Sequence, residues 1–307
     1  MKVLVGIDGS PGSLEAVRLT GRLVSPQHDK VCFYYAPPVF QVVQRGGLDA
    51  SITTRARQAL ATAVFDDACN ALPAPLSETV ERIVGTQDPR HGLILAGEVQ
   101  EADLIVVGAR GLGPLQRLLL GSVSSSIVHA ARCPVLVVRA QAERLAREPL
   151  RVLLATAEDN VSRRAADLLP QFTWPAGTEG RVITVIESMF AGEIPKWLEE
   201  KARSADAEAM AQAWVREHDV ERQAHRNELA ALIQQLPAPF HGHEPIVAEG
   251  HTAEQILKAI AAESIDLVVL GARGLGAISR VLVGSTSAKV LSHAPCSVLI
   301  VRQPERP

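Results

Sequence analysis

Two copies of a glycine-serine motif are the residues of this chain whose types and spacing best suit ligand binding. The first reads Gly108-x2-Gly111-x9-Gly121-Ser122, and the second reads Gly271-x2-Gly274-x9-Gly284-Ser285. Glycine lets backbone approach a ligand closely because it has no Cβ. The Gly-Ser pair opens a helix-length segment, and the free N–H groups and positive dipole end of a helix suit a phosphate. The motif therefore predicts an anion site in each copy, with Ser122 and Ser285 as helix N-caps and hydroxyl donors to the anion.

Other chemistries fit the sequence less well. There is no Gly-x4-Gly-Lys-Ser/Thr loop, no complete dinucleotide-binding fingerprint and no Gly-x-Ser-x-Gly elbow, which disfavours Walker-type NTPases, NAD(P) enzymes and serine hydrolases. His241, His243 and His251 form a loose group that could suggest zinc, but no cysteine or paired carboxylate stands nearby at ligand spacing. A loop whose glycines serve packing alone is the competing interpretation of the motif.

Four arginines lie inside the glycine motifs, at matching positions in the two copies. A guanidinium there suits a triphosphate, although arginines more commonly project from a solvated loop; the four are Arg110, Arg117, Arg273 and Arg280.

The chain contains two copies of one sequence repeat. Residues 102–139 and 265–302 share 20 of 38 positions without a gap, at an offset of 163. The N-terminal segments match at an offset of 149, so the second copy is 14 residues longer in its middle (163 − 149). We expect two tandem domains, residues 1–142 and 148–307, joined near residues 140–149.

Each copy alternates strand-like and helix-like segments. Short, continuous Val/Ile/Leu runs are typical of parallel strands covered on both faces; the predicted strands are Val3–Ile7, Val31–Ala36, Thr79–Val84, Leu104–Val107, Val135–Val138, Val152–Thr156, Val182–Ile186, Pro245–Ala248, Leu267–Leu270 and Val298–Val301. Helix-length patterns lie between them, including Ser13–Leu23, Asp49–Leu72, Leu93–Gln100 and Ser122–Ala131. The fold class is thus α/β: two doubly wound domains, each a five-stranded parallel sheet flanked by helices. The charged, alanine-rich stretch Pro195–Leu236 predicts a long surface helix, with one possible break.

Composition excludes several classes of protein. The 307 residues are 47% hydrophobic, 21% charged and 4% aromatic, which suits a globular chain with aliphatic cores and not a base-stacking single-strand binder. A net charge of −3 predicts neither nucleic acid nor an anionic membrane as partner. The four cysteines are scattered, and no apolar run has the length of a signal peptide core or membrane span. These features favour a cytoplasmic protein with reduced thiols and no metal.

At this point the sequence resembles the universal stress proteins, in their tandem two-domain form. The resemblance covers essentially the whole chain. It depends on the Val-Gly-Ile-Asp-Gly-Ser opening (5–10), the Asp-Leu-Ile-Val-Val-Gly segment (103–108), the glycine motif and the Cys-Pro-Val-Leu-Val-Val segment (133–138). The glycine motif resembles that of the family's ATP-binding branch, which implies an adenine nucleotide alpha hydrolase-like fold.

The resemblance implies a nucleotide site in each copy. Asp8 would meet a ribose hydroxyl, and the backbone of Ala36 would meet the adenine edge. The implied first site comprises Gly6, Asp8, Ala36, Gly108, Ala109, Arg110, Gly111, Gly121, Ser122 and Val123. The implied second site comprises Val185, Gly271, Ala272, Arg273, Gly274, Gly284, Ser285 and Thr286. Ala157 stands opposite Asp8 in the second copy, so the second site is expected to bind more weakly, and Asp159 aligns with Ser10, the expected N-cap of the first helix.

The function implied is binding of ATP, ADP or AMP, with or without Mg²⁺, by a stress-response regulator that hydrolyses ATP slowly if at all. An adenylate-transferring or ATP-hydrolysing enzyme of a related fold is one alternative, although its His-x-Gly-His or Ser-Gly-Gly-x-Asp-Ser signature is missing. A nucleotide-free scaffold is another. The resemblance also implies pairing of domains through the terminal strands Val135–Val138 and Val298–Val301, within one chain or in a homodimer, and a protein partner that the sequence does not identify.

Overall fold

All ten predicted strands are present, and they form a single sheet. The computed structural model describes residues 1–38, 50–110, 120–139, 149–156, 160–187, 205–272 and 284–302. The strand order is β3-β2-β1-β4-β5-β10-β9-β6-β7-β8. The strands are β1 (Lys2–Gly6), β2 (Lys30–Tyr35), β3 (Glu81–Val84), β4 (Leu104–Gly108), β5 (Val135–Val138), β6 (Arg151–Ala155), β7 (Glu179–Ile186), β8 (Ile246–Glu249), β9 (Leu267–Gly271) and β10 (Ser297–Val301). The expected fold class, two parallel five-stranded halves, is confirmed, and strand ends differ from the predictions by no more than three residues.

The two halves join through their terminal strands. Strands within each half are parallel, whereas β5 and β10 pair antiparallel, with Leu136 opposite Leu299 and Val137 opposite Val298. These strands are fully buried Val/Leu/Ile segments, and pairing satisfies backbone groups that an open sheet edge would expose. The predicted pairing through the terminal strands is therefore confirmed within one chain.

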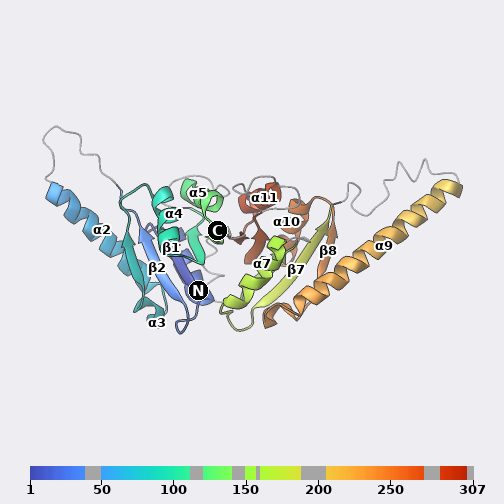
Figure 1. Ribbon diagram of the computed structural model, residues 1–307, viewed down its shortest axis with the longest axis horizontal. Helices are drawn as coiled ribbons and strands as arrows, with labels where there is room; N and C mark the ends of the chain where they lie inside the picture. The colour runs from blue at the N-terminus through green and yellow to red at the C-terminus, as the bar shows by residue number, and fades with distance from the viewer. Residues whose placement is uncertain are drawn as a thin grey trace.

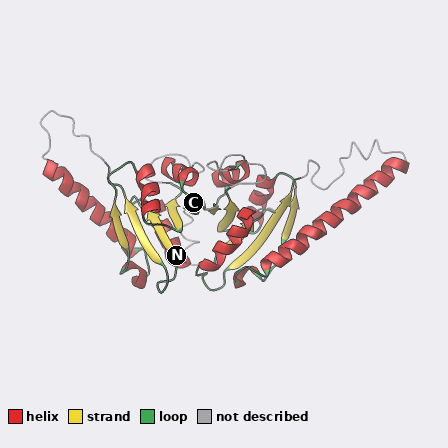
Figure 2. Ribbon diagram, in the orientation of Figure 1, coloured by secondary structure: helices red, strands yellow, loops and turns green. Residues whose placement is uncertain are grey.

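Helices cover both faces of the sheet (Figures 1 and 2). The described helices are α1 (Pro11–Leu23), α2 (Ala50–Asn70), α3 (Ala74–Ser77), α4 (Pro89–Val99), α5 (Ser122–Ala130), α7 (Asn160–Leu168), α9 (Ala205–Ile233), α10 (Thr252–Ala262) and α11 (Ser285–His293), with 3-10 turns η1 (Leu169–Gln171) and η2 (Ala238–Phe240). One core lies under α1, α2, α7 and α9, and the other under α4, α5, α10 and α11. Strand residues alternate between them: Phe33 faces the first core and Tyr34 the second. Burial on both faces explains why the strands have continuous apolar sequences.

Helix α1 begins where the sequence predicts its cap. Ser10 has extended backbone, and its hydroxyl oxygen accepts a hydrogen bond from the N–H of Ser13. Pro11 occupies the first helical position, where its fixed φ is favourable and its missing N–H costs nothing. The buried face of α1 includes Ala16, Leu19 and Leu23. This cap fixes the chain direction directly after β1, at the edge where the candidate site lies.

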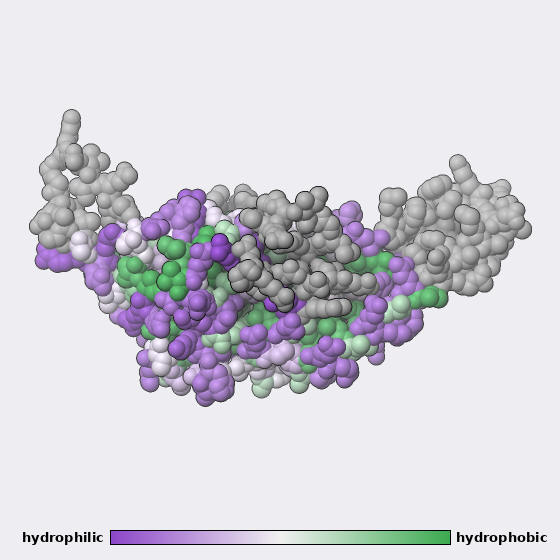
Figure 3. Space-filling model, in the orientation of Figure 1, coloured by the Kyte–Doolittle hydropathy of each residue, from purple (hydrophilic) through white to green (hydrophobic). Residues whose placement is uncertain are grey.

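Helices α2 and α9 extend away from the sheet at opposite ends of the molecule (Figure 1). The predicted long helix is unbroken over Ala205–Ile233; its predicted beginning, 195–204, lies outside the described residues. Its C-terminal end is anchored by the buried Leu229 and Ile233, whereas Val220 is 71% exposed. Over the described residues in Figure 3, hydrophilic residues cover most of the visible face and hydrophobic ones form small patches. Within the described part of the chain, no helix has both the length and the apolar character needed to span a membrane.

Candidate functional site

A cavity of about 370 Å³ lies at the carboxyl ends of β1, β2 and β4 in the first half. Its volume falls within the range of small-molecule sites, and it lies where doubly wound sheets bind ligands. Eight of the ten residues expected at the first site line it: Gly6, Asp8, Ala36, Gly108, Arg110, Gly121, Ser122 and Val123. Ala109 is buried and does not line the cavity, and Gly111 lies outside the described residues. The fold thus brings these residues to one place, while their role in binding stays a prediction.

The glycine loop is fastened to the end of β5 and to the start of α5. The N–H of Ala109 donates to Val138 O at 2.7 Å, and the N–H of Gly121 donates to Ala109 O at 2.8 Å. The buried Ser124 hydroxyl donates to Gly108 O at 2.6 Å. Ser124 was missed from the sequence, although a serine two residues after the motif recurs as Ser287. Strand end, loop and helix start therefore form one hydrogen-bonded unit.

The N-terminus of α5 faces the cavity without a side-chain cap. Gly121, not Ser122, is the N-cap residue, and Ser122 is the first helical residue, with an exposed side chain. Gly284 and Ser285 have the same arrangement in α11. The prediction that Ser122 and Ser285 are N-caps is therefore wrong, because the glycines before them adopt the extended cap conformation. The first-turn N–H groups of α5 have no side-chain acceptor, which suits an anion.

Gly108 is required for packing. A Cβ on Gly108 would lie 2.7 Å from the carbonyl carbon of Gly12, and a Cβ on Gly12 would lie 2.8 Å from Arg110 O. The loop and the first turn of α1 therefore pack backbone to backbone. The packing interpretation of the motif holds at this glycine, since a side chain there would meet α1 and not the cavity.

Asp8 and Arg110 bring opposite charges to the cavity wall. The Asp8 carboxylate accepts the N–H of Ser10 at 3.0 Å, so it stabilises the turn before α1 while also lining the cavity. The Arg110 side chain makes no hydrogen bond or ion pair to a described residue, and its Nε is buried. Burial, and next the charge of Arg110, lower the pKa of the buried Arg139 guanidinium. Arg110 is therefore a cation on the cavity wall that forms no ion pair with a described residue, Asp8 included.

Tyr34 is a wall residue that the sequence analysis missed. Its ring lines the cavity, and its buried hydroxyl has no hydrogen-bond partner among the described residues. Burial, with a smaller effect from Asp88, raises the pKa of this phenol. The hydroxyl occupies the space that Cβ atoms on Gly85 and Gly92 would take. A tyrosine within a strand has no sequence pattern that marks it as a site residue. The role of Gly85 and Gly92, which leave room for its hydroxyl, is evident only once the strands are paired.

Comparison with known proteins agrees with this architecture. The model of the universal stress protein family matches residues 1–139 and 150–302. The chain belongs to the universal stress protein family. A universal stress protein of Mycolicibacterium smegmatis is 28% identical over 315 residues, covering 98% of this chain and 96% of the relative. The crystal structure of a universal stress protein from Archaeoglobus fulgidus matches with a TM-score of 0.61 and 19% identity, covering 98% of both chains.

A solved universal stress protein in complex with cAMP matches about one half of the chain. It is 28% identical, covers 45% of this chain and 96% of its own, and has a TM-score of 0.34.

The second universal stress protein domain repeats the loop geometry of the first. The N–H of Ala272 donates to Val301 O at 2.8 Å, and the N–H of Gly284 donates to Ala272 O at 2.7 Å. The Ser287 hydroxyl donates to Gly271 O at 2.6 Å. Val185, Ser285 and Thr286 lie at the ends of β7 and the start of α11. Of the residues expected here, Arg273 and Gly274 lie outside the described residues, as do Arg117, Arg280, Ala157 and Asp159.

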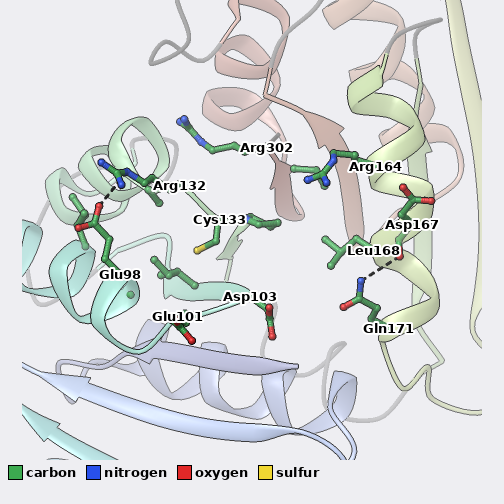
Figure 4. Close-up of a pocket in the computed structure, with 17 residues that line it drawn as sticks. Glu98, Glu101, Asp103, Arg132, Cys133, Arg164, Asp167, Leu168, Gln171 and Arg302 are labelled. Atoms are coloured by element: carbon green, nitrogen blue, oxygen red, sulfur yellow. Dashed lines mark hydrogen bonds and ion pairs between the residues drawn. The ribbon is translucent and has the colours of Figure 1, made fainter. Parts of the chain in front are cut away.

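A larger cleft, of about 820 Å³, lies at the boundary between the two domains (Figure 4). It contains none of the residues expected at the sites. It lies at the amino ends of β4 and β5 and beside the carboxyl end of β10, where Val301 and Arg302 line it. No residue at the carboxyl ends of the inner strands β1 and β4 or β6 and β9 lines it, although doubly wound folds bind ligands there. Charges of both signs line it, some paired with one another, such as Arg132 with Glu98 at 3.2 Å. The smaller cavity is therefore the better candidate site.

The histidine group has no metal-site geometry. Among the described residues, no three His, Cys, Asp or Glu side chains are arranged to hold a metal ion. His241 instead lies with its Nε2 2.8 Å from Leu236 O, at the end of α9.

Proposed function

We propose that this universal stress protein binds adenine nucleotides, ATP, ADP or AMP, at the carboxyl edge of each domain, and acts as a regulator of the stress response. One observation carries the proposal: the uncapped N-terminus of α5 opens into a cavity that also holds the carboxylate of Asp8 and Arg110, which pairs with none of the residues that the structure describes. A cation and a helix N-terminus together suit phosphates, and a carboxylate suits ribose hydroxyls.

The residues divide the ligand between them. The first-turn N–H groups of α5 and the Ser122 hydroxyl would hold phosphate oxygens, with Arg110 beside them. Asp8 would accept a ribose hydroxyl, and the base would lie against the apolar wall that includes Ala36, Tyr34 and Leu93. Mg²⁺, where present, would bind through the phosphates.

The residues that line this cavity also lead us to expect slow hydrolysis of ATP. Asp8 is the one carboxylate among the described residues that line the cavity, and it already accepts the Ser10 N–H. General-base catalysis needs a group within hydrogen-bond reach of the attacking water. A regulator whose nucleotide persists fits this arrangement better than an enzyme that turns it over.

The second site is expected to be weaker. Ala157 stands where the first copy has Asp8, and a charge-assisted hydrogen bond contributes about 1.5–3 kcal/mol. Its loss predicts an affinity about ten- to a hundred-fold lower in the second domain.

Native mass spectrometry with ATP and Mg²⁺ tests the proposal. We expect two nucleotides on the unmodified chain. Ser122→Glu should leave one, because a carboxylate about 4 Å from a phosphate charge costs about 4 kcal/mol near a protein surface. An acidic residue in the first turn is favourable for the helix, so the fold should survive. Ser285→Glu is the matched variant of the second site, and Ser122→Ala is the control without charge. Absence of bound ATP, ADP and AMP from the unmodified chain would refute the function.

A further inference from the structure

Two equivalent arginines cross the domain boundary in opposite directions. Arg139 and Arg302, 163 positions apart, directly follow the terminal strands β5 and β10. They are 7% and 9% exposed, so both guanidinium groups are buried. Arginine is seldom so buried unless its donors find acceptors.

Each arginine contacts the last turn of a helix in the opposite domain. Arg139 donates from a terminal guanidinium nitrogen to Leu291 O of α11 at 2.5 Å. Arg302 donates to Val128 O and, at 3.0 Å, to His129 O of α5. In Figure 4 the Arg302 side chain lies at the domain boundary, beside the cleft. The last carbonyls of a helix have no partner within it, and a cation there also complements the helix dipole.

The same two helices carry the proposed phosphate sites at their other ends. Helices α5 and α11 are nine residues each, which makes them about 13 Å long. An anion at the N-terminus of α5 and Arg302 at its C-terminus therefore act on one short rigid element. The same holds for α11, with Arg139 at its C-terminus.

These contacts close into a ring through both domains. From α5 the path runs through Arg302 to its neighbour Val301. The carbonyl of Val301 accepts the N–H of Ala272, and the carbonyl of Ala272 accepts the N–H of Gly284 at the start of α11. From α11 it returns through Arg139 to Val138, Ala109 and the N–H of Gly121 at the start of α5. Each phosphate site is thus joined to the other by a short series of hydrogen bonds and one arginine in each direction.

We propose that the two nucleotide sites are positively coupled through this ring, so that a nucleotide in one domain tightens binding in the other. The inference rests on the proposed function and adds its regulation. A bound phosphate holds α5 in place and thereby fixes the carbonyls that Arg302 needs. Arg302 then fixes the end of β10 and the start of α11 before a second nucleotide arrives. In the first domain, a phosphate beside Arg110 also offsets the repulsion between Arg110 and the nearby Arg139, which strengthens the contact of Arg139 with α11.

Binding constants measure this coupling directly. Val123→Trp and Thr286→Trp fill one site each without adding charge to either helix, and give the affinity of each site alone. The product of the two association constants of the unmodified chain should exceed the product of the single-site constants by about 5- to 10-fold, a coupling of the usual size. In the Arg139→Met/Arg302→Met variant the ratio should fall to about one, and Arg139→Lys/Arg302→Lys should restore part of it.

Hydrogen exchange gives a second readout that needs no arginine variant. In Thr286→Trp, ATP can fill only the first site, and we expect slower amide exchange in the last turn of α11, in the other domain. Three results would each overturn the coupling but not the proposed function. They are two bound nucleotides whose association constants give a ratio of one to the single-site product, the same ratio in the Arg139→Met/Arg302→Met variant as in the unmodified chain, and unchanged amide exchange in α11. Failure of any nucleotide to bind would overturn the proposed function as well, so the two failures are distinguishable.

Discussion

At the scale of single residues, the glycines of the first domain serve the protein's own packing as much as any ligand. Gly85 and Gly92 leave room for the Tyr34 hydroxyl, which a Cβ at either position would meet at 2.1 and 1.8 Å. The second domain supports this interpretation. By the repeat offsets, Ile183 replaces Tyr34 and Gln255 replaces Gly92. Where the tyrosine is lost, the need for glycine on the facing helix is lost with it.

Tyr34→Phe and Gly92→Ala should therefore be strongly coupled. Gly92→Ala alone should cost about 1–3 kcal/mol, because its methyl group overlaps the Tyr34 hydroxyl. Tyr34→Phe alone should be close to neutral, since it removes a buried hydroxyl that has no partner among the described residues. In the double variant the cost of Gly92→Ala should fall by about 1 kcal/mol or more. Urea denaturation of the four proteins measures this cycle, and additive effects would contradict it.

The thiols should react according to burial. Burial raises the pKa of Cys32 and Cys133 to about 11 and that of Cys296 to about 12, so all three are neutral near pH 7. Alkylation proceeds through the thiolate. In the folded protein, labelling of the partly exposed Cys133 should rise about tenfold per pH unit between pH 8 and 10, while Cys32 and Cys296 stay unlabelled. Peptide mapping after iodoacetamide, with unfolded protein as control, tests this; a plateau at Cys133 below pH 9 would disagree.

At the scale of elements, packing against the sheet, and not helix propensity, decides which parts of α9 contribute to the free energy of unfolding. The helix meets the sheet near its C-terminal end, where Leu229 and Ile233 are buried and Arg222 pairs with Glu249 at 3.4 Å. Its middle projects into solvent. The sequence predicted the helix from its length and composition, but could not show where it leaves the sheet, because that depends on the position of β8.

Two alanine substitutions on α9 should separate these regions. Leu229→Ala removes a side chain that is 6% exposed and should cost about 2–4 kcal/mol. Val220→Ala, on the same helix but 71% exposed, should change the free energy of unfolding by no more than about 0.5 kcal/mol. Chemical denaturation followed by circular dichroism compares them. Equal effects would mean that the projecting part of α9 is packed in solution.

At the scale of the whole molecule, the sequence predicted the strands and the duplication, because buried parallel strands and repeats leave direct patterns. The pairing of the terminal strands was implied only by the resemblance to universal stress proteins. The site was predicted only in part. The edge at which Asp8, Arg110 and Gly121 meet followed from the strand ends, but the wall formed by Tyr34 and the cap position of Gly121 required exact backbone geometry. Arg139 and Arg302 are the last residues of the two matching segments of the repeat. Their contacts are with the opposite domain, and no local sequence pattern predicts such contacts.

The boundary between the domains predicts how one domain behaves alone. In the chain, Leu136 pairs with Leu299, which is its own equivalent at the offset of 163, so the β5–β10 register is the one that two copies of β5 would adopt around a twofold axis. A fragment of residues 1–142 leaves β5 as an open, apolar edge, and such edges recruit a matching strand. We expect this fragment to form a homodimer, in which Arg139 of each copy contacts Val128 O of the other, as Arg302 does in the full chain. Light scattering should give twice the fragment mass, and Val137→Pro, which removes a backbone donor from β5, should abolish the dimer. A folded, monomeric fragment would show that the strand pairing depends on covalent linkage.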